Sequence, residues 1–147
     1  MTKTTFGAGI GIIGAFVAKS LGGWDAALVT LLTLMAIDFA TGLMVAGVFH
    51  KSKKTETGAL SSNIGWKGLC KKVFTMMFVL VGYRVDITLG IDMVRNSVII
   101  GYGAIELISI VENAGLMGLP VPAIIIKAID LLSAKAAPEQ KNETNGN

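Results

Sequence analysis

Long apolar runs separated by charged stretches dominate the amino-acid sequence. The clearest run covers residues 26–49 and holds a single charged side chain, Asp38. Because a membrane-spanning helix needs about 20 mostly apolar residues, this run predicts a transmembrane helix. Trp24 precedes it, and His50 and Lys51 follow it, at the places where aromatic anchors and basic flanks lie at membrane interfaces.

Two further runs predict spanning helices at about 69–91 and 93–111. The first contains Arg84 and Asp86 in its last third, and the second contains Glu106. Since almost no residues separate the two runs, they are expected to form a tight helical hairpin.

The N-terminal run, residues 6–21, is shorter and leaves three alternatives open. It is a span, an interfacial helix or the apolar core of a signal peptide. Gly7, Gly11 and Gly14 are spaced by four and three residues, which places them on one face of a helix. Small residues on one face allow membrane helices to pack closely, so these glycines form either a self-association ridge or a merely flexible segment.

The C-terminal part predicts a surface helix and a tail. Pro120 and Pro122 set an extended elbow, after which residues 123–134 form a short amphipathic helix. Residues 135–147 are polar and are expected to be disordered. The predicted fold class is an all-α integral membrane protein with three or four transmembrane helices plus this C-terminal amphipathic helix, built as one membrane domain over residues 1–134.

Composition excludes several classes of protein. Among 147 residues, 52% are hydrophobic and 16% are charged, whereas soluble domains carry about 25% charged residues. One cysteine and one histidine exclude a disulfide framework and a His-rich metal site. Because no nucleophile with a base and no phosphate-binding glycine loop is present, we expect no enzyme activity, no cofactor and no metal.

The basic residues predict the topology. The predicted loop over residues 50–72 contains only one acidic residue, Glu56, and six lysines, which are Lys51, Lys53, Lys54, Lys67, Lys71 and Lys72. The positive-inside rule places such a loop in the cytoplasm. The C-terminus is then cytoplasmic, and the N-terminus lies outside with three spans or inside with four. Nucleic-acid binding is a poorer interpretation, because the loop has few aromatic residues and lies between spans.

Two carboxyl groups fall near the predicted middle of the membrane. Asp38 lies 12 residues into its run and Glu106 lies 11 residues past Arg95, which at 1.5 Å per residue is about 16–18 Å in each case. A charged side chain there costs about 2.5–3.5 kcal/mol, so it faces protein or water rather than lipid. Three alternatives stay open: protonated carboxyls bonded between helices, carboxyls lining a lumen between assembled subunits, or a proton or ion relay.

Small residues near these carboxyls predict helix packing, either within one chain or between copies. Gly42 and Ala46 are four residues apart in one predicted helix, and Ser97 and Gly101 are four apart in another.

Three sequence blocks are similar to one known family. They are the aspartate with its Thr-Gly step at Asp38, Thr41 and Gly42, the S-x-x-x-G-x-K-G-x-x-K-K pattern over 61–72, and the block from Glu106 to Pro122. Over residues 20–132 the chain resembles the phage-lysis and toxin-secretion holin family of small bacterial inner-membrane proteins.

The resemblance implies a function without catalytic residues. Such proteins form homo-oligomeric lesions in the bacterial cytoplasmic membrane, which depolarise the cell and release endolysin, or toxin, for host lysis. The implied partners are the lipid bilayer, further copies of the chain and an antiholin, with endolysin as cargo that is not specifically bound and with no nucleic acid. The alternatives are an antiholin-type regulator, a small ion or solute transporter, and a membrane-embedded assembly factor.

Overall fold

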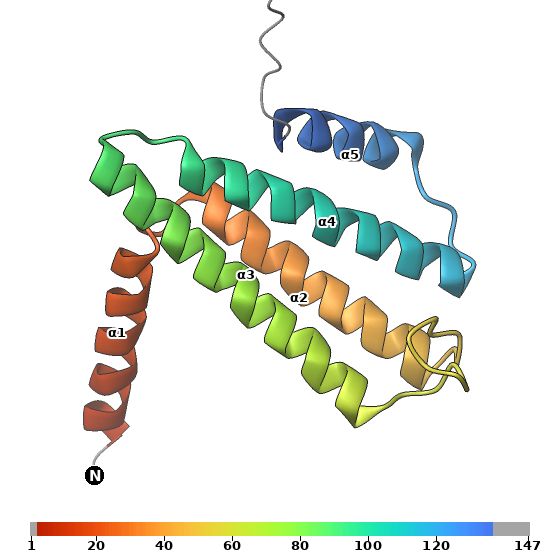
Figure 1. Ribbon diagram of the computed structural model, residues 1–147. Helices are drawn as coiled ribbons and strands as arrows, with labels where there is room; N and C mark the ends of the chain where they lie inside the picture. The colour runs from red at the N-terminus through yellow and green to blue at the C-terminus, as the bar shows by residue number, and fades with distance from the viewer. Residues whose placement is uncertain (1–2, 137–147) are drawn as a thin grey trace, which may run out of the picture.

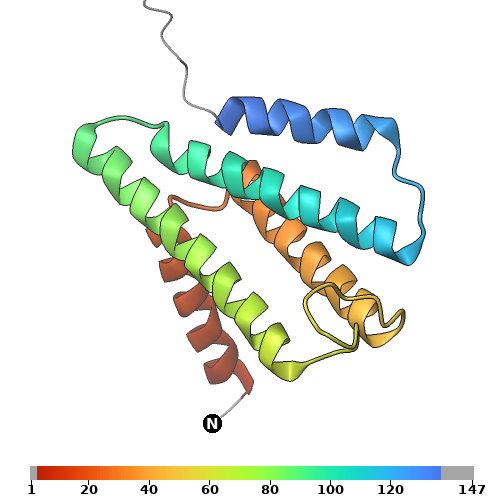
Figure 2. The ribbon, with the colours of Figure 1, turned by 45° about the vertical axis from the view of Figure 1, so that its right-hand side comes forward.

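The computed structural model describes residues 3–136, which form five α-helices (Figure 1). The helices are α1 (Lys3–Ser20), α2 (Ala26–Gly47), α3 (Ser62–Leu89), α4 (Val94–Met117) and α5 (Ala123–Ala136). No strand occurs in this described part, and the predicted all-helical fold is confirmed. α4 lies at the centre and packs against α2, α3 and α5, whereas α1 stands apart from the other helices (Figures 1 and 2).

Helices α2 and α4 run in the same direction and pack against each other, and α3 runs in the opposite direction beside α4 (Figure 1). Asp25, directly before α2, contacts Arg95 at the start of α4, and Asp38 in α2 contacts Asn113 late in α4. Contacts that advance together along both helices define a parallel pair. The long helix α3 therefore returns the chain to the end of the molecule from which α2 started (Figure 2).

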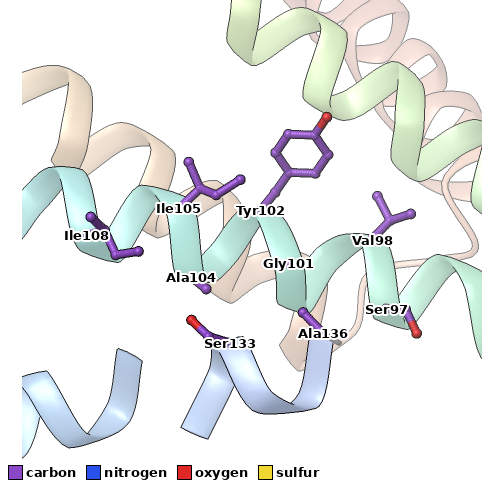
Figure 3. A pocket seen from close by; sticks show the side chains of 9 residues that line it. All are labelled: Ser97, Val98, Gly101, Tyr102, Ala104, Ile105, Ile108, Ser133 and Ala136. Atoms are coloured by element: carbon purple, nitrogen blue, oxygen red, sulfur yellow. The ribbon is translucent and has the colours of Figure 1, made fainter. Parts of the chain in front are cut away.

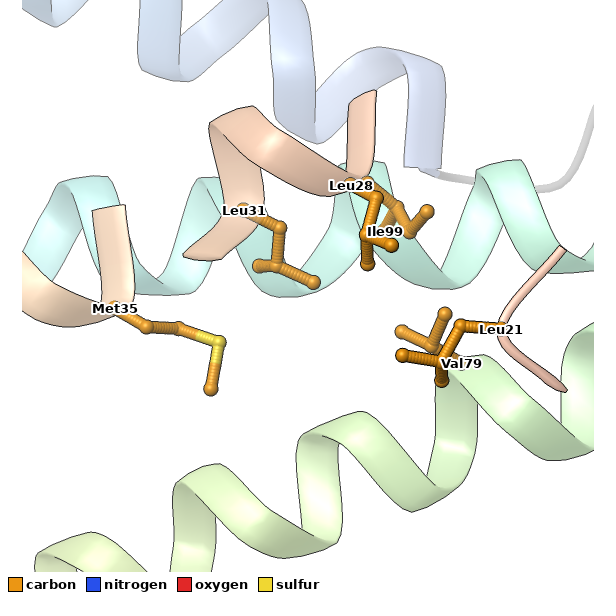
Figure 4. Packing of buried hydrophobic residues seen from close by; sticks show 6 residues of the cluster. All are labelled: Leu21, Leu28, Leu31, Met35, Val79 and Ile99. Atoms are coloured by element: carbon orange, nitrogen blue, oxygen red, sulfur yellow. The ribbon is translucent and has the colours of Figure 1, made fainter. Parts of the chain in front are cut away.

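The apolar core lies around the first half of α2. Buried residues at spacings of three and four line one face of that helix, which is the pattern that helix packing requires. The side chains that meet in this core are Leu28, Leu31 and Met35 of α2, Val79 of α3, Ile99 of α4, and Leu21 from the turn before α2 (Figure 4). The second half of α2 buries Val45 and Ala46 and also carries the polar side chains Asp38 and Thr41.

Two helices, α2 and α4, are long and apolar enough to cross a membrane. The prediction of three or four such helices is wrong in this respect. Within α3, every stretch of 18 residues contains at least three charged side chains, which come from Lys67, Lys71, Lys72, Arg84 and Asp86. The apolar part of α1 is shorter, over Gly7–Ser20.

The limits of two helices also differ from the predicted ones. α3 begins at Ser62 rather than near residue 69, so half of the predicted basic loop is helical. α4 continues past the predicted end at residue 111, because Glu112 and Asn113 are compatible with a helix. It stops only at Gly118, whose φ of +81° is the left-handed conformation that ends many helices.

The last helix, α5, folds back along α4 after the proline elbow (Figure 1). It continues through Lys135 and Ala136, two residues that were predicted to belong to the tail. The remainder of that tail lies outside the described residues. Between α4 and α5 lies a pocket of about 440 Å³, where Ala136 faces Gly101 and Ser133 lies nearer to Ala104 (Figure 3).

A close backbone contact fixes the hairpin between α3 and α4. Gly82 lies against the start of α4, where a Cβ atom would come within 3.0 Å of the Arg95 Cα and 3.2 Å of its nitrogen. Asp86, one turn further along α3, accepts hydrogen bonds of 2.9 Å from the backbone nitrogens of both Val94 and Arg95. The carboxylate thus satisfies two of the free N–H groups at the start of α4.

Substituting this glycine should separate the hairpin. We expect Gly82→Val to lower the free energy of unfolding by about 1–3 kcal/mol, because the atoms in the way belong to backbone and cannot rotate aside. Gly68→Val in the same helix is the matched control, since a Cβ there meets nothing within 4 Å. Denaturant unfolding in detergent measures both, and equal losses would contradict the assigned contact.

Candidate functional site

One lysine joins two carboxylates from different helices. The Lys72 Nζ of α3 lies 2.9 Å from the Asp38 Oδ2 of α2 and 2.5 Å from the Glu106 Oε2 of α4. The side chains of the three residues are only 10–13% exposed. We call these three residues the ion cluster; through a single ammonium group it connects α2, α3 and α4.

An amide extends the ion cluster toward the C-terminal end of α4. The Asn113 Nδ2 donates to the Asp38 Oδ1 at 3.3 Å and to the Thr41 Oγ1 at 3.0 Å. The Thr41 hydroxyl in turn donates to the Ile37 carbonyl oxygen, at 2.9 Å. Among the described residues, no buried side-chain nitrogen or oxygen lacks a hydrogen-bond partner. The polar centre is thus internally satisfied, as buried polar groups must be.

The three members of the ion cluster lie at one level of the bundle. Asp38 is nine residues from the end of α2, Lys72 ten residues from the start of α3, and Glu106 eleven residues from the end of α4. At 1.5 Å per residue these depths are about 14–17 Å. Since the apolar core of a bilayer is about 30 Å thick, helices that cross it would hold the cluster near its middle.

The structure corrects the assignment of Lys72. This lysine was predicted to lie in a cytoplasmic loop that sets the topology, whereas it lies in a helix and pairs with both deeply placed carboxylates. Lys72 shares one face of α3 with a row of buried residues at spacings of three and four. That row consists of Thr75, Val79, Gly82 and Asp86. This spacing places Lys72 on the inward face of α3, a face that only the packing of the helices reveals.

The other predicted site residues are distributed over the molecule. Gly42 faces Asn113, because a Cβ atom on this glycine would lie 3.8 Å from the Asn113 Nδ2. Ala46 is buried one turn further along α2. Ser97 and Gly101 line the pocket beside α5. The remaining lysines lie in the connection before α3, as Lys51, Lys53 and Lys54, or on the exposed side of α3, as Lys67 and Lys71. A Cβ atom added at Gly7, Gly11 or Gly14 would meet no other atom within 4 Å, so these glycines pack against no other helix of the described chain.

A second polar contact, which sequence reasoning missed, lies at the opposite end of α4. The Arg95 guanidinium donates to the Leu21 carbonyl oxygen at 2.5 Å, to the Asp25 Oδ2 at 2.6 Å and to the Gly23 carbonyl oxygen at 3.4 Å. Asp25 also accepts a 2.8 Å hydrogen bond from the Leu28 nitrogen and so caps α2. We call this contact the arginine clamp; it holds the start of α4 to the start of α2.

The arginine clamp makes the free energy of unfolding depend on pH in the acidic range. Its hydrogen bond from Arg95 is the main reason that the pKa of the Asp25 carboxyl lies below the ordinary value of 3.8. The folded chain therefore binds this proton more weakly than the unfolded chain. The stabilisation is complete above that ordinary value and is lost as the pH falls through the lower, folded-state value.

Replacing Asp25 tests this acid dependence. We expect the free energy of unfolding to fall less steeply below about pH 4 in Asp25→Asn than in the unchanged protein. Unfolding at a series of pH values measures the slope. Asp130→Asn is the control, because Asp130 is exposed and has no ion pair among residues 3–136. A parallel loss of stability in unchanged and Asp25→Asn protein would contradict the expectation.

The ion cluster is suited to holding the three helices together. Both carboxylates are engaged by Lys72. Within the described part of the chain, no three His, Cys, Asp or Glu side chains gather closely enough to hold a metal ion. Because Lys72 lies between two carboxylates, it holds α2, α3 and α4 together. Separating these helices would leave an unpaired charge on each of them.

These features define a class: a small helical membrane protein whose helices are joined by buried polar contacts. Residues 15–134 match the model of the bacteriophage holin family, and the chain belongs to this family, which is not an enzyme family. The predicted resemblance is thereby confirmed.

Several bacterial and phage proteins are similar to the chain. An uncharacterised protein of Halalkalibacterium halodurans is 39% identical over 127 residues, covering 82% of this chain and 88% of the relative. A 14.9 kDa protein of Clostridium perfringens is 33% identical over 129 residues, covering 86% and 92%. A probable holin of Bacillus phage phi105 is 27% identical over 114 residues, covering 77% of each. No solved structure matches the chain.

Proposed function

We propose that this protein is a holin, which oligomerises in the bacterial cytoplasmic membrane and forms lesions that depolarise the cell and release endolysin for host lysis. The observation that carries the proposal is the ion cluster, placed in a chain of the bacteriophage holin family. In a single copy its charges are paired inside the bundle, which suits a protein that accumulates without harm.

Lesion formation then requires the ion cluster to change its surroundings. One chain of 147 residues is too small to enclose a wide path, so a large opening needs many copies. When copies assemble, the ion pairs among Asp38, Lys72 and Glu106 break, and the three side chains are instead solvated by water in a shared lumen. Charged groups in membranes favour such water-filled surfaces over lipid.

The proposed topology has three crossings, of which the one by α3 is more highly charged than the two apolar ones by α2 and α4. Because α2 and α4 are parallel, both can cross a membrane only if the chain between them crosses back, and α3 is about 42 Å long with 28 residues. Its charges suit this path, since Lys72 is paired and Arg84 and Asp86 lie near one end. The lysine-bearing connection 48–61 and the C-terminus are then cytoplasmic.

Cysteine labelling tests this topology. In a Cys70→Ser background, a membrane-impermeant thiol reagent should label Asp92→Cys, in the turn between α3 and α4, in intact cells. Glu56→Cys, in the connection 48–61, should react only after the membrane is permeabilised, because it lies on the cytoplasmic side. Equal labelling of both residues in intact cells would refute three crossings.

Expression of the chain alone tests the function. We expect induction in a bacterium to leave growth unchanged at first and then to collapse the membrane potential abruptly, as reported by a potential-sensitive dye. Co-expressed endolysin should lyse the culture at that moment and not before. Induction without depolarisation would exclude a holin and support an antiholin, while a gradual, solute-dependent effect would support a transporter.

A further inference from the structure

A cavity of about 790 Å³ opens where the end of α2, the start of α3 and the end of α4 meet the connection 48–61. The ion cluster forms part of its wall, but most of the lining lies beyond that cluster. Small-molecule sites typically occupy 300–1,000 Å³, so the cavity is large enough to hold a headgroup and part of a chain.

The cavity carries an excess of positive charge. Lys53, Lys54, Lys67 and Lys71 line it, and none of these lysines has an ion pair within residues 3–136. Lys72, Asp38 and Glu106 also line the cavity, and Glu112 is the third acidic residue of the lining. Five lysines against three carboxylates leave a net excess of positive charge, which favours an anionic ligand.

Apolar side chains that are open to the outside of the bundle form another part of the wall. Leu43 and Phe74 line the cavity and are 39% and 60% exposed, and Ile105 lines it at 58% exposed. A small inorganic anion would leave these side chains uncovered. A ligand with an anionic head and an apolar chain matches both parts of the wall.

We propose that this cavity binds an anionic phospholipid of the host membrane. Its phosphodiester lies among the four lysines, and an acyl chain runs past Leu43 and Phe74 into the bilayer. Basic pockets between membrane helices on the cytoplasmic side recognise such headgroups, at about 1 kcal/mol for each lysine near the surface, or about fivefold in affinity. The proposal needs the chain in a membrane and does not rest on lesion formation.

Lipid binding to the purified full chain in detergent tests the proposal. Native mass spectrometry should show phosphatidylglycerol retained at least about 20-fold more strongly than phosphatidylcholine. The variant K53Q/K54Q/K67Q/K71Q should lose this preference. The matched control K19Q/K51Q/K127Q/K135Q removes four exposed lysines outside the cavity lining and should keep the preference. K53R/K54R/K67R/K71R should also keep it, because the charge is retained.

Three results would overturn the proposal. One is equal retention of both lipids by the unchanged protein, and another is an equal loss in the cavity variant and the control. The third is competition by inorganic phosphate as effective as that by phosphatidylglycerol, which would indicate a phosphate site without a lipid. Circular dichroism checks that each variant keeps its helices, and the paired variants K53Q/K54Q and K67Q/K71Q should each lose part of the preference. Because the assay involves no lysis, its failure would leave the holin function standing.

Discussion

Replacing Lys72 by methionine should lower the free energy of unfolding by about 3–5 kcal/mol, one of the two largest effects expected in this protein. Methionine keeps most of the volume but leaves Asp38 and Glu106 facing each other without a counter-ion. Removing one partner of a buried ion pair is costly because the remaining charge stays in a poorly solvating place. The same loss should bring depolarisation forward after induction, since the closed bundle is weakened. Denaturant unfolding in detergent measures the first effect, and the onset of depolarisation, reported by the potential-sensitive dye, measures the second.

Neutral variants separate charge from shape at this site. Glu106→Gln leaves one cation and one anion, Lys72 and Asp38, and should therefore be much milder than Lys72→Met. Combining Asp38→Asn, Lys72→Met and Glu106→Gln removes all three charges and should recover part of the lost stability. If the triple variant is as unstable as Lys72→Met alone, the cost lies in packing and the electrostatic account is wrong. If onset times do not change in any variant, the cluster has no part in triggering.

Replacing Arg95 by methionine should cost about 2–4 kcal/mol, the second large effect. The change leaves the buried Leu21 carbonyl without its donor and Asp25 without its cation, and a buried unsatisfied polar group costs about 1–3 kcal/mol by itself. Arg95→Lys should recover only part of this, because an ammonium cannot reproduce the fork of donors that reaches both Leu21 and Asp25. Unfolding in detergent measures both variants.

Arg84 provides the control for the arginine clamp. It lies on the exposed side of α3 and forms no ion pair among the described residues, so Arg84→Met should change stability by less than about 0.5 kcal/mol. Similar losses for Arg84→Met and Arg95→Met would show that the bundle responds to overall charge rather than to this contact.

The apolar pattern predicted most of the fold because burial and membrane insertion both follow local hydrophobicity. α2 lies within two residues of its predicted limits, since Asp25 caps its start and the apolar run continues to its end. The start of α3 was missed because charged residues and two glycines, Gly65 and Gly68, occupy its first turns. Those residues read as a loop when only hydrophobicity is considered.

The sequence predicted the two carboxylates of the candidate site but not the residues that pair with them. Depth along their runs singled out Asp38 and Glu106, because a carboxylate in an apolar helix is costly wherever it occurs. Their partners could not be found in this way, since Lys72 and Asn113 come from positions 34 and 75 residues away from Asp38. Pairing at that separation depends on how α2, α3 and α4 are placed around each other.

Two separate attachment points have a mechanical consequence for α4. The arginine clamp fixes this helix at Arg95, and the ion cluster fixes it again at Glu106, about 16 Å further along its axis. A rod held at one point can swing, whereas a rod held at two can neither swing nor slide by a helical turn without releasing one of them. A movement of α4 relative to α2 must therefore break at least one of these two polar contacts, and the helix can then turn about the contact that remains.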